Sequence, residues 1–205
     1  VGAPPGSAST RLFPALATAA GVDASKVKIT NIKPNLQEQM LIQKQVDASL
    51  VFNVTSYMNI LGQKLDPQKD FRWFPYGASG LDIYSNGVMV SRALAEKNPK
   101  AVAGLVRAIN KAFQEVVADP AAGIKAIKDV ESLINADLEA KRLQFALENL
   151  IVSDESKANG VGAVDMARLT RSIGIIKSLY GLKETPAAET IFSGKFLPPM
   201  DARKL

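Results

Sequence analysis

The first ten residues, VGAPPGSAST (Val1–Thr10), hold the pattern that decides the fold. A short apolar segment at residues 1–3 is followed by a glycine and a serine, and then by a helical pattern of apolar residues that stops at Gly21. A strand, a glycine turn and a capped helix in this order are typical of a parallel α/β unit. We therefore expect a strand at residues 1–3 and a helix that begins after Ser7.

The alternation of strand and helix patterns continues through the first half of the chain. Residues 26–30 alternate polar and apolar side chains with period two, which predicts a strand with one buried face. Asn35 and Glu38 resemble a capping box that opens a second helix. Residues 48–52 form a short apolar run, as in the buried strands of parallel sheets. The order strand, helix, strand, helix, strand predicts a doubly wound α/β fold, with further strands expected at residues 71–76 and 83–90.

Residues 91–205 are expected to be mostly helical. Three helix-start signals stand in this part: Asn98 before Pro99, Asp119 before Pro120, and Asn135. A loop is expected at residues 153–162, and a last helix from Asp165 to Tyr180. A run of helices does not easily close a core alone, so we expect apolar helix faces to be exposed here.

Composition excludes several chemistries. Cysteine and histidine are both absent, so the chain has no thiolate nucleophile, no Cys/His zinc site and no histidine base. The net charge of +5 is spread thinly over both halves without a Lys/Arg block, and a nucleic-acid partner is not expected. We assign no catalytic residue, no metal site and no cofactor.

Three stretches, residues 1–9, 45–51 and 80–91, together resemble periplasmic solute-binding proteins of ABC importers. The branch that they resemble serves sulfonates, taurine and thiamine-precursor pyrimidines. The resemblance implies a type II periplasmic-binding-protein-like fold, with two α/β lobes that clamp a ligand between them. Residues 1–85 would form the ligand-binding lobe II, and residues 86–205 the crossover strand and the C-terminal helices of an incomplete lobe I.

Because the resemblance begins only at the second lobe, we expect the sequence to be a fragment. Val1 stands where a methionine would open a complete gene product, so either a leader has been removed or the chain starts partway through a longer protein. Lost cover over the C-terminal helices makes self-association of the chain a further expectation.

The start of the first helix is the principal candidate site. Gly6 lets the backbone approach a ligand, and Ser7 caps a helix whose first N–H groups favour an anion. An ordinary capped helix that binds nothing is the alternative. Asn53 follows the strand predicted at residues 48–52, at the strand end where open α/β sheets bind ligands, although it could instead be a helix cap. The resemblance adds Tyr84 and Asn86 at the crossover, where Asn86 could instead belong to a turn. The candidate ligand residues are Gly6, Ser7, Ala8, Ser9, Thr10, Asn53, Tyr84 and Asn86.

The resemblance implies a non-enzymatic, periplasmic or lipid-anchored protein that captures a small polar solute and delivers it to a membrane permease. Two other classes stay open: an enzyme on the same fold, similar to pyrimidine synthases or sulfinate hydrolases, and the effector-binding domain of a transcription regulator. Phe52, Trp73 and Tyr76 are more readily explained as packing residues, and Arg11 as a solvated surface residue.

Overall fold

The computed structural model describes all of residues 1–205 and divides them into two compact units. Unit 1 comprises Val1–Tyr84 and Ala167–Pro186, and unit 2 comprises Ser85–Met166 and Ala187–Leu205. The chain therefore passes from one unit to the other at three points. The assignment of residues 1–85 and 86–205 to two family lobes stays a prediction.

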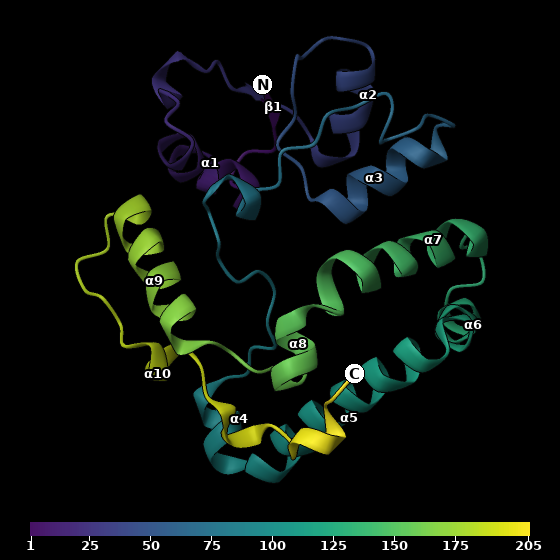
Figure 1. Cartoon of the computed structure of the whole chain (residues 1–205), viewed down its shortest axis with the longest axis vertical. Helices are drawn as coiled ribbons and strands as arrows, with labels where there is room; N and C mark the ends of the chain where they lie inside the picture. The colour runs from purple at the N-terminus through teal and green to yellow at the C-terminus, as the bar shows by residue number, and fades with distance from the viewer. The chain divides into compact units, whose positions relative to one another are not determined.

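Three parallel extended segments lie side by side in unit 1. Strand β1 (Gly2–Ala3) pairs in parallel with β2 (Thr30–Asn31), and Gly2 forms a parallel bridge to Ser49 on its other side. The Gly2 N–H donates to the Ala48 carbonyl at 2.7 Å, and the Leu50 N–H donates to the Gly2 carbonyl at 2.9 Å. Strand β1 is thus central, and Figure 1 shows it among the helices of this unit.

Each of these segments is followed by a helix of unit 1. Helix α9 also belongs to this unit, apart from its first residue. The helices of unit 1 are α1 (Ala8–Ala19), α2 (Gln37–Ile42), α3 (Asn53–Gly62) and α9 (Met166–Tyr180), with the short turns η1 (Ala24–Lys26), η2 (Pro34–Leu36) and η3 (Gly77–Ser79).

The sheet is much smaller than the sequence predicts. The strand expected at residues 26–30 forms only at Thr30–Asn31, and that at 48–52 is reduced to a bridge. Residues 71–76 and 83–90 form no strand. A strand requires a neighbour whose N–H and C=O groups pair with its own, and apolar runs in these segments find no such neighbour. The doubly wound sheet is therefore present only as a three-segment parallel core.

The expected capping box at Asn35 and Glu38 is wrong. Helix α2 begins at Gln37 after the turn η2, and its N-cap residue Leu36 offers no side-chain hydrogen bond. The Glu38 carboxylate is instead buried and accepts a hydrogen bond from the Ser56 hydroxyl of α3. The Glu38 carboxylate therefore binds the Ser56 hydroxyl of α3. It does not cap the start of α2, as the sequence pattern predicts.

The hydrophobic core lies mostly in unit 1. Its members come from β1, the segments that flank it and the buried faces of α1 and α3. Met58 and Ile60 on α3, together with Pro67, are the largest fully buried side chains. The other buried apolar side chains of this unit are Ala3, Ala17, Ile32, Val46, Leu50 and Leu81.

Unit 2 is a succession of helices. Helix α5 packs on α4 and α6, and α6 packs on α7. The Gln114 amide of α5 donates to the carbonyls of Asp201 and Lys204, so the C-terminal segment also lies against this helix. The helices are α4 (Arg92–Lys97), α5 (Pro99–Ala118), α6 (Pro120–Val130), α7 (Ala136–Ala146), α8 (Asp154–Asn159) and α10 (Ala188–Ile191), with the π-helical turn η4 (Leu147–Ile151) and the turns η5 (Gly194–Phe196) and η6 (Met200–Ala202).

The helix starts of unit 2 follow the sequence signals. Helices α5, α6 and α7 begin directly after Asn98, Asp119 and Asn135, and the last two side chains accept hydrogen bonds from the first turn of their helices. The loop expected at residues 153–162 is wrong in part, because α8 forms there. Its capping box pairs Ser153 with Ser156, a serine where the sequence rule looks for Glu or Gln.

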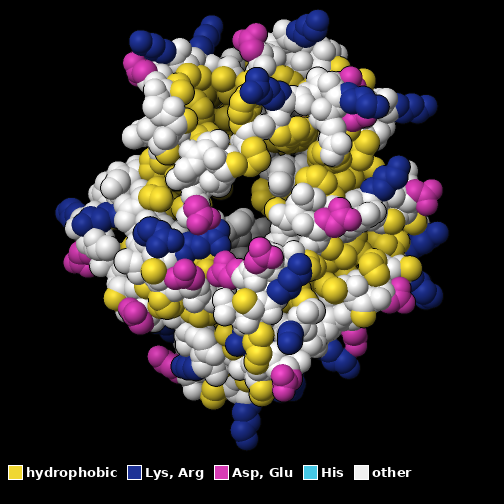
Figure 2. All heavy atoms as spheres, in the orientation of Figure 1, with side chains coloured by type: hydrophobic (Ala, Val, Ile, Leu, Met, Phe, Trp, Pro, Cys, Tyr) yellow, Lys and Arg dark blue, Asp and Glu magenta, His cyan; other side chains and the backbone are white.

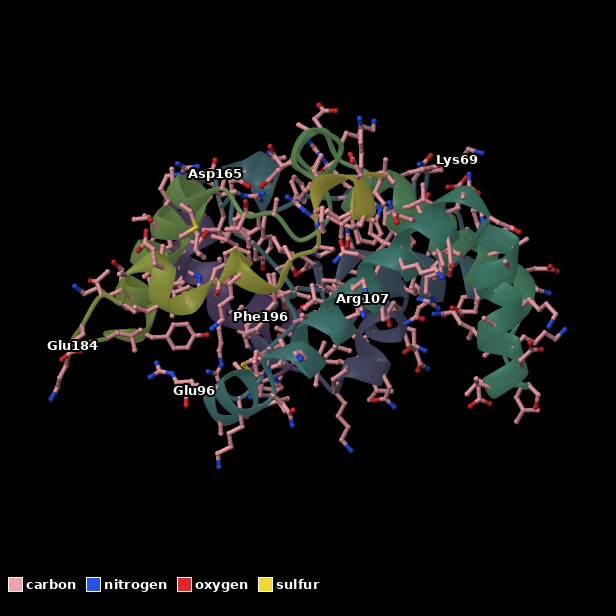
Figure 3. The ribbon with its side chains drawn as sticks, turned by 90° about the horizontal axis from the view of Figure 1, so that it is seen from below. Lys69, Glu96, Arg107, Asp165, Glu184 and Phe196 are labelled. Carbon is pink, nitrogen blue, oxygen red and sulfur yellow. The ribbon has the colours of Figure 1, made fainter.

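The expectation of exposed apolar helix faces is confirmed. Val130 at the end of α6 is 90% exposed, and Leu105, Ile127 and Leu150 are about half exposed. Leu133, in the turn between α6 and α7, is 92% exposed. Figure 2 shows hydrophobic side chains at the surface over α5–α7, with Lys and Arg interspersed among Asp and Glu. Lys69, Glu96 and Glu184 extend away from the ribbon in Figure 3. None of the helices has both the length and the apolar character that crossing a bilayer demands.

Gly2 has no room for a side chain, and this generates a stability prediction. A Cβ at this position would lie 2.2 Å from Cδ1 of Ile32. We expect Gly2→Ala to lower the free energy of unfolding by about 1–3 kcal/mol, as overpacked cores do. Urea denaturation measures this. Gly87→Ala is the matched control, since a Cβ there meets nothing within 4 Å.

The same clash predicts a rescue. Valine at position 32 lacks the Cδ1 atom, so the double variant Gly2→Ala/Ile32→Val should be more stable than Gly2→Ala alone. A double variant less stable than the single one would show that close packing around Gly2 is not the constraint.

Candidate functional site

Three helix N-termini of unit 1 lie at one edge of its parallel core. Helix α1 follows β1, α2 follows β2, and α3 follows the segment that forms the bridge at Ser49. Because the three segments run in parallel, their carboxyl ends meet at the same edge. Open α/β sheets bind ligands at this edge, and helix N-termini give it a positive potential.

The turn before α1 has the conformation that the sequence predicts. Gly6 has a φ of 72°, in the left-handed region that glycine adopts without strain. Ser7 is the N-cap residue, and its Oγ accepts a hydrogen bond from the Thr10 N–H at 3.2 Å. The predicted cap is therefore confirmed.

The hydroxyl groups at the start of α1 are held by the protein itself. The Thr10 hydroxyl donates to the Pro4 carbonyl at 2.8 Å, and the Ser9 hydroxyl donates to the Leu50 carbonyl at 3.2 Å. Ser7 Oγ lies 2.8 Å from Thr10 Oγ1 and 3.0 Å from Ser9 Oγ. Since the protons of Ser9 and Thr10 are already placed, Ser7 donates its own to one of these two oxygens.

The backbone of this turn supplies N–H groups that have no acceptor within the helix. The N–H groups of Ala8 and Ser9 belong to the first turn of α1, where no helical carbonyl precedes them. They face the edge where the helix dipole is positive. The arrangement can hold an oxygen of a sulfonate, carboxylate or phosphate group, while the hydroxyls keep the turn in shape.

Gln37 fastens the neighbouring segment, and sequence reasoning missed it. Its side chain is buried, and Nε2 donates to the Leu50 carbonyl at 2.8 Å and to Ser49 Oγ at 3.1 Å. The Ser49 hydroxyl donates in turn to the Gly2 carbonyl at 3.3 Å. The start of α2 is thereby tied to the same backbone segment that Ser9 contacts. The available signal was a glutamine in the first turn of a helix that follows a strand.

Tyr76 supports the turn from another direction. Its hydroxyl donates to the Ser9 carbonyl at 2.9 Å. Burial raises the pKa of Tyr76 from 10.0 to about 12, so the phenol stays protonated and able to donate at neutral pH. Tyr76 is therefore a packing residue, as predicted, and its hydrogen bond to Ser9 also stabilises the start of α1. Trp73 packs as well, with its ring against Tyr57 and its Nε1–H on the Pro67 carbonyl.

Arg11 places a cation beside the glycine turn. A Cβ built on Gly6 would lie 3.5 Å from Nη2 of Arg11, so the guanidinium lies next to this turn. The same guanidinium lies over the Tyr180 ring of α9, 5.6 Å from its centroid. Arg11 is exposed, as expected of a solvated surface residue, and the contact with Tyr180 adds an orientation that the sequence does not predict.

Asn53 stands at the start of α3, on the same edge as α1. Its Oδ1 accepts a hydrogen bond from the Val54 N–H at 2.8 Å, which leaves the Nδ2 protons for another partner. The N-cap residue of α3 is Phe52, so Asn53 is not the cap. Phe52 is 50% exposed, and the interpretation of this residue as core is wrong.

Tyr84 and Asn86 are not brought together by either unit. Tyr84 is the last residue of the first segment of unit 1, whereas Asn86 is an exposed residue of unit 2. One face of the Tyr84 ring is covered by the guanidinium of Arg168, 4.1 Å from the ring centroid. Arg168 had no role in the sequence analysis, because no motif joins it to residues so far away in the chain.

One family model matches the chain: the model described as NMT1/THI5 like covers residues 1–123. The matched range includes every candidate ligand residue and ends inside α6. No curated protein matches the sequence.

The raised pKa of Tyr76 predicts a stability loss at high pH. The folded protein binds the phenolic proton more tightly than the unfolded chain does. The resulting stability is fully present below pH 10.0 and is lost as the pH rises toward about 12. We expect Tyr76→Phe to be about 1 kcal/mol less stable at neutral pH, because the hydrogen bond to Ser9 is gone. Its stability should also fall less steeply above pH 10.0.

Urea denaturation at a series of pH values measures both effects. Tyr180→Phe is the matched control, since Tyr180 is 44% exposed. An alkaline stability profile of Tyr76→Phe that parallels the parent would contradict the role given to Tyr76.

Proposed function

This chain belongs to the NMT1/THI5-like family, and from that membership we propose that it is the solute-binding component of an ABC importer. The family has a periplasmic-binding-protein-like fold and is generally substrate-binding rather than enzymatic. In this proposal the chain captures a small polar solute in the periplasm, or outside the cell on a lipid anchor, and delivers it to a membrane permease.

We place the solute at the carboxyl edge of β1, against the first turn of α1. The observation that carries this placement is the pair of N–H groups at Ala8 and Ser9, which have no acceptor within the helix, in a turn whose Gly6 lies next to the Arg11 guanidinium. Backbone donors and a cation on one side of a turn favour a negatively charged group. A sulfonate such as taurine therefore fits this turn, and a pyrimidine precursor would have to bring an anionic or strongly polar substituent to it.

Each candidate residue then has a separate role. Gly6 lets the ligand approach the backbone, Ala8 offers an N–H without a bulky side chain, and Ser7, Ser9 and Thr10 hold the turn. At the neighbouring helix start, Asn53 offers its Nδ2 protons to a second polar group of the solute. The side chains of Tyr84 and Asn86, in the segment that leaves unit 1, are proposed as further contacts with the solute.

The partner proposals follow the same logic. A permease is the expected macromolecular partner of an importer's solute-binding component, and no nucleic acid is expected. Self-association through the exposed apolar side chains of α5, α6 and the turn after α6 is part of the proposal, because such surfaces are seldom left uncovered in water. Sedimentation over a range of protein concentrations tests it.

A change of charge at the helix cap tests the anion site. Asparagine and aspartate both cap helices well, so Ser7→Asn and Ser7→Asp should each keep α1 folded. Only Ser7→Asp adds a negative charge where the anionic group would sit. With taurine as the probe in calorimetric titration, we expect Ser7→Asp to weaken binding by about tenfold or more relative to Ser7→Asn.

The neutral member of the pair serves as the control. Equal affinities for taurine in Ser7→Asn and Ser7→Asp would show that the anionic group does not bind at the start of α1. Hydroxymethylpyrimidine as a second probe separates the two ligand classes, because the affinity of this uncharged compound should change little between the two variants.

A further inference from the structure

A single arginine of α9 contacts three consecutive residues of the segment that leaves unit 1. Arg168 Nη2 donates to Asp82 Oδ1 at 2.6 Å and to the Ile83 carbonyl at 3.4 Å, and the guanidinium lies 4.1 Å from the centroid of the Tyr84 ring. Arg168 is 24% exposed at its side chain, whereas Asp82 is 59% exposed. The Arg168 guanidinium therefore makes an ion pair, a hydrogen bond to a carbonyl and a cation–π contact at the same time.

The position of this contact along the chain is specific. The chain leaves unit 1 after Tyr84 and returns to it at Ala167. Arg168 is the second residue after the return, and its partners are the last three residues before the departure. We call these two passages of the chain between the units its crossings. The Arg168 side chain thus joins the first crossing to the second, although Asp82 and Arg168 are 86 residues apart in the sequence.

The geometry requires an arginine. A guanidinium donates hydrogen bonds in its plane and stacks on an aromatic ring with its face, so it makes both kinds of contact at once. A lysine ammonium could pair with Asp82 but could not cover the Tyr84 ring in the same way. The backbone of residues 82–90 forms neither helix nor strand, so side-chain contacts of this kind have a large share in fixing it.

We propose that Arg168 is a positioning residue that fastens the two crossings to each other on unit 1 and fixes the orientation of Tyr84. The residue lies outside the range that the family model matches, which ends at residue 123. A consequence that rests on the proposed function is that the ring face covered by Arg168 is closed to a solute. The fastening itself needs no ligand.

Chymotrypsin tests the fastening directly. The protease cleaves after aromatic residues that can leave the protein surface, so cleavage of the Tyr84–Ser85 bond reports how often Tyr84 leaves Arg168. We expect Arg168→Met to speed this cleavage about five- to tenfold, the effect of losing one charge-assisted contact at a partly exposed site. Arg168→Lys should give an intermediate rate.

Two controls make the result specific. Arg171→Met changes an exposed arginine of the same helix and should leave the Tyr84–Ser85 cleavage rate unchanged. Cleavage after Phe52, which is 50% exposed and is followed by Asn53, is the internal reference in every digest. A Tyr84–Ser85 rate in Arg168→Met equal to that in Arg171→Met would overturn the proposal. An equal rise in cleavage after Phe52 would also overturn it, because it would indicate general loosening.

The conservative variant keeps the test valid if Arg168→Met does not fold. In that case, a Tyr84–Ser85 cleavage rate in Arg168→Lys at the wild-type level would overturn the proposal. Taurine is left out of these digests, so a failed solute-binding proposal and a failed fastening proposal give separate results.

Discussion

The parallel pairing of β1 on both of its sides is the constraint on which unit 1 depends. Gly2 exchanges hydrogen bonds with the segment around Ser49, while its strand pairs with Thr30–Asn31 on the other side. This three-segment register brings the starts of α1, α2 and α3 to one edge. Glycine at position 2 also leaves room for the Ile32 side chain, whose Cδ1 atom would lie 2.2 Å from a Cβ at this position. The register and the candidate site therefore have the same origin.

Hydrogen bonds to a few backbone carbonyls then give the edge its detailed shape. The Leu50 carbonyl accepts from both Ser9 and Gln37, and so joins the starts of α1 and α2 through the segment between them. The Ser9 carbonyl accepts from Tyr76 in turn. Polar side chains that a sequence reader would assign to ligand binding are largely used to hold the backbone. In the proposed site, the groups assigned to a ligand are therefore the N–H groups of the first turn of α1.

The sequence predicted local features well and pairing poorly. The cap at Ser7 and the helix starts after Asp119 and Asn135 depend on neighbours within one turn, and the structure has all of them. The strands expected at residues 71–76 and 83–90 depend on a distant partner segment, which no local pattern specifies, and they do not form.

The candidate site divides in the same way. The Gly6–Thr10 turn could be located from its residues, because a glycine turn and a helix cap are local. The contribution of Gln37 and the covering of Tyr84 by Arg168 could not, since both depend on segments that folding brings together. The burial of Glu38 against Ser56 is a third case, in which a tertiary hydrogen bond displaced a local capping pattern.

Helix α9 takes part in two Arg–Tyr contacts, one near each of its ends. Near its start, Arg168 lies over Tyr84, and at its last residue, Tyr180 lies under the guanidinium of Arg11 on α1. One Arg–Tyr contact thus joins α9 to the end of the segment that leaves unit 1 at Tyr84. The other joins α9 to the first turn of α1. The contact at Arg168 is the stronger one, because its centroid distance is 4.1 Å rather than 5.6 Å and an ion pair with Asp82 accompanies it.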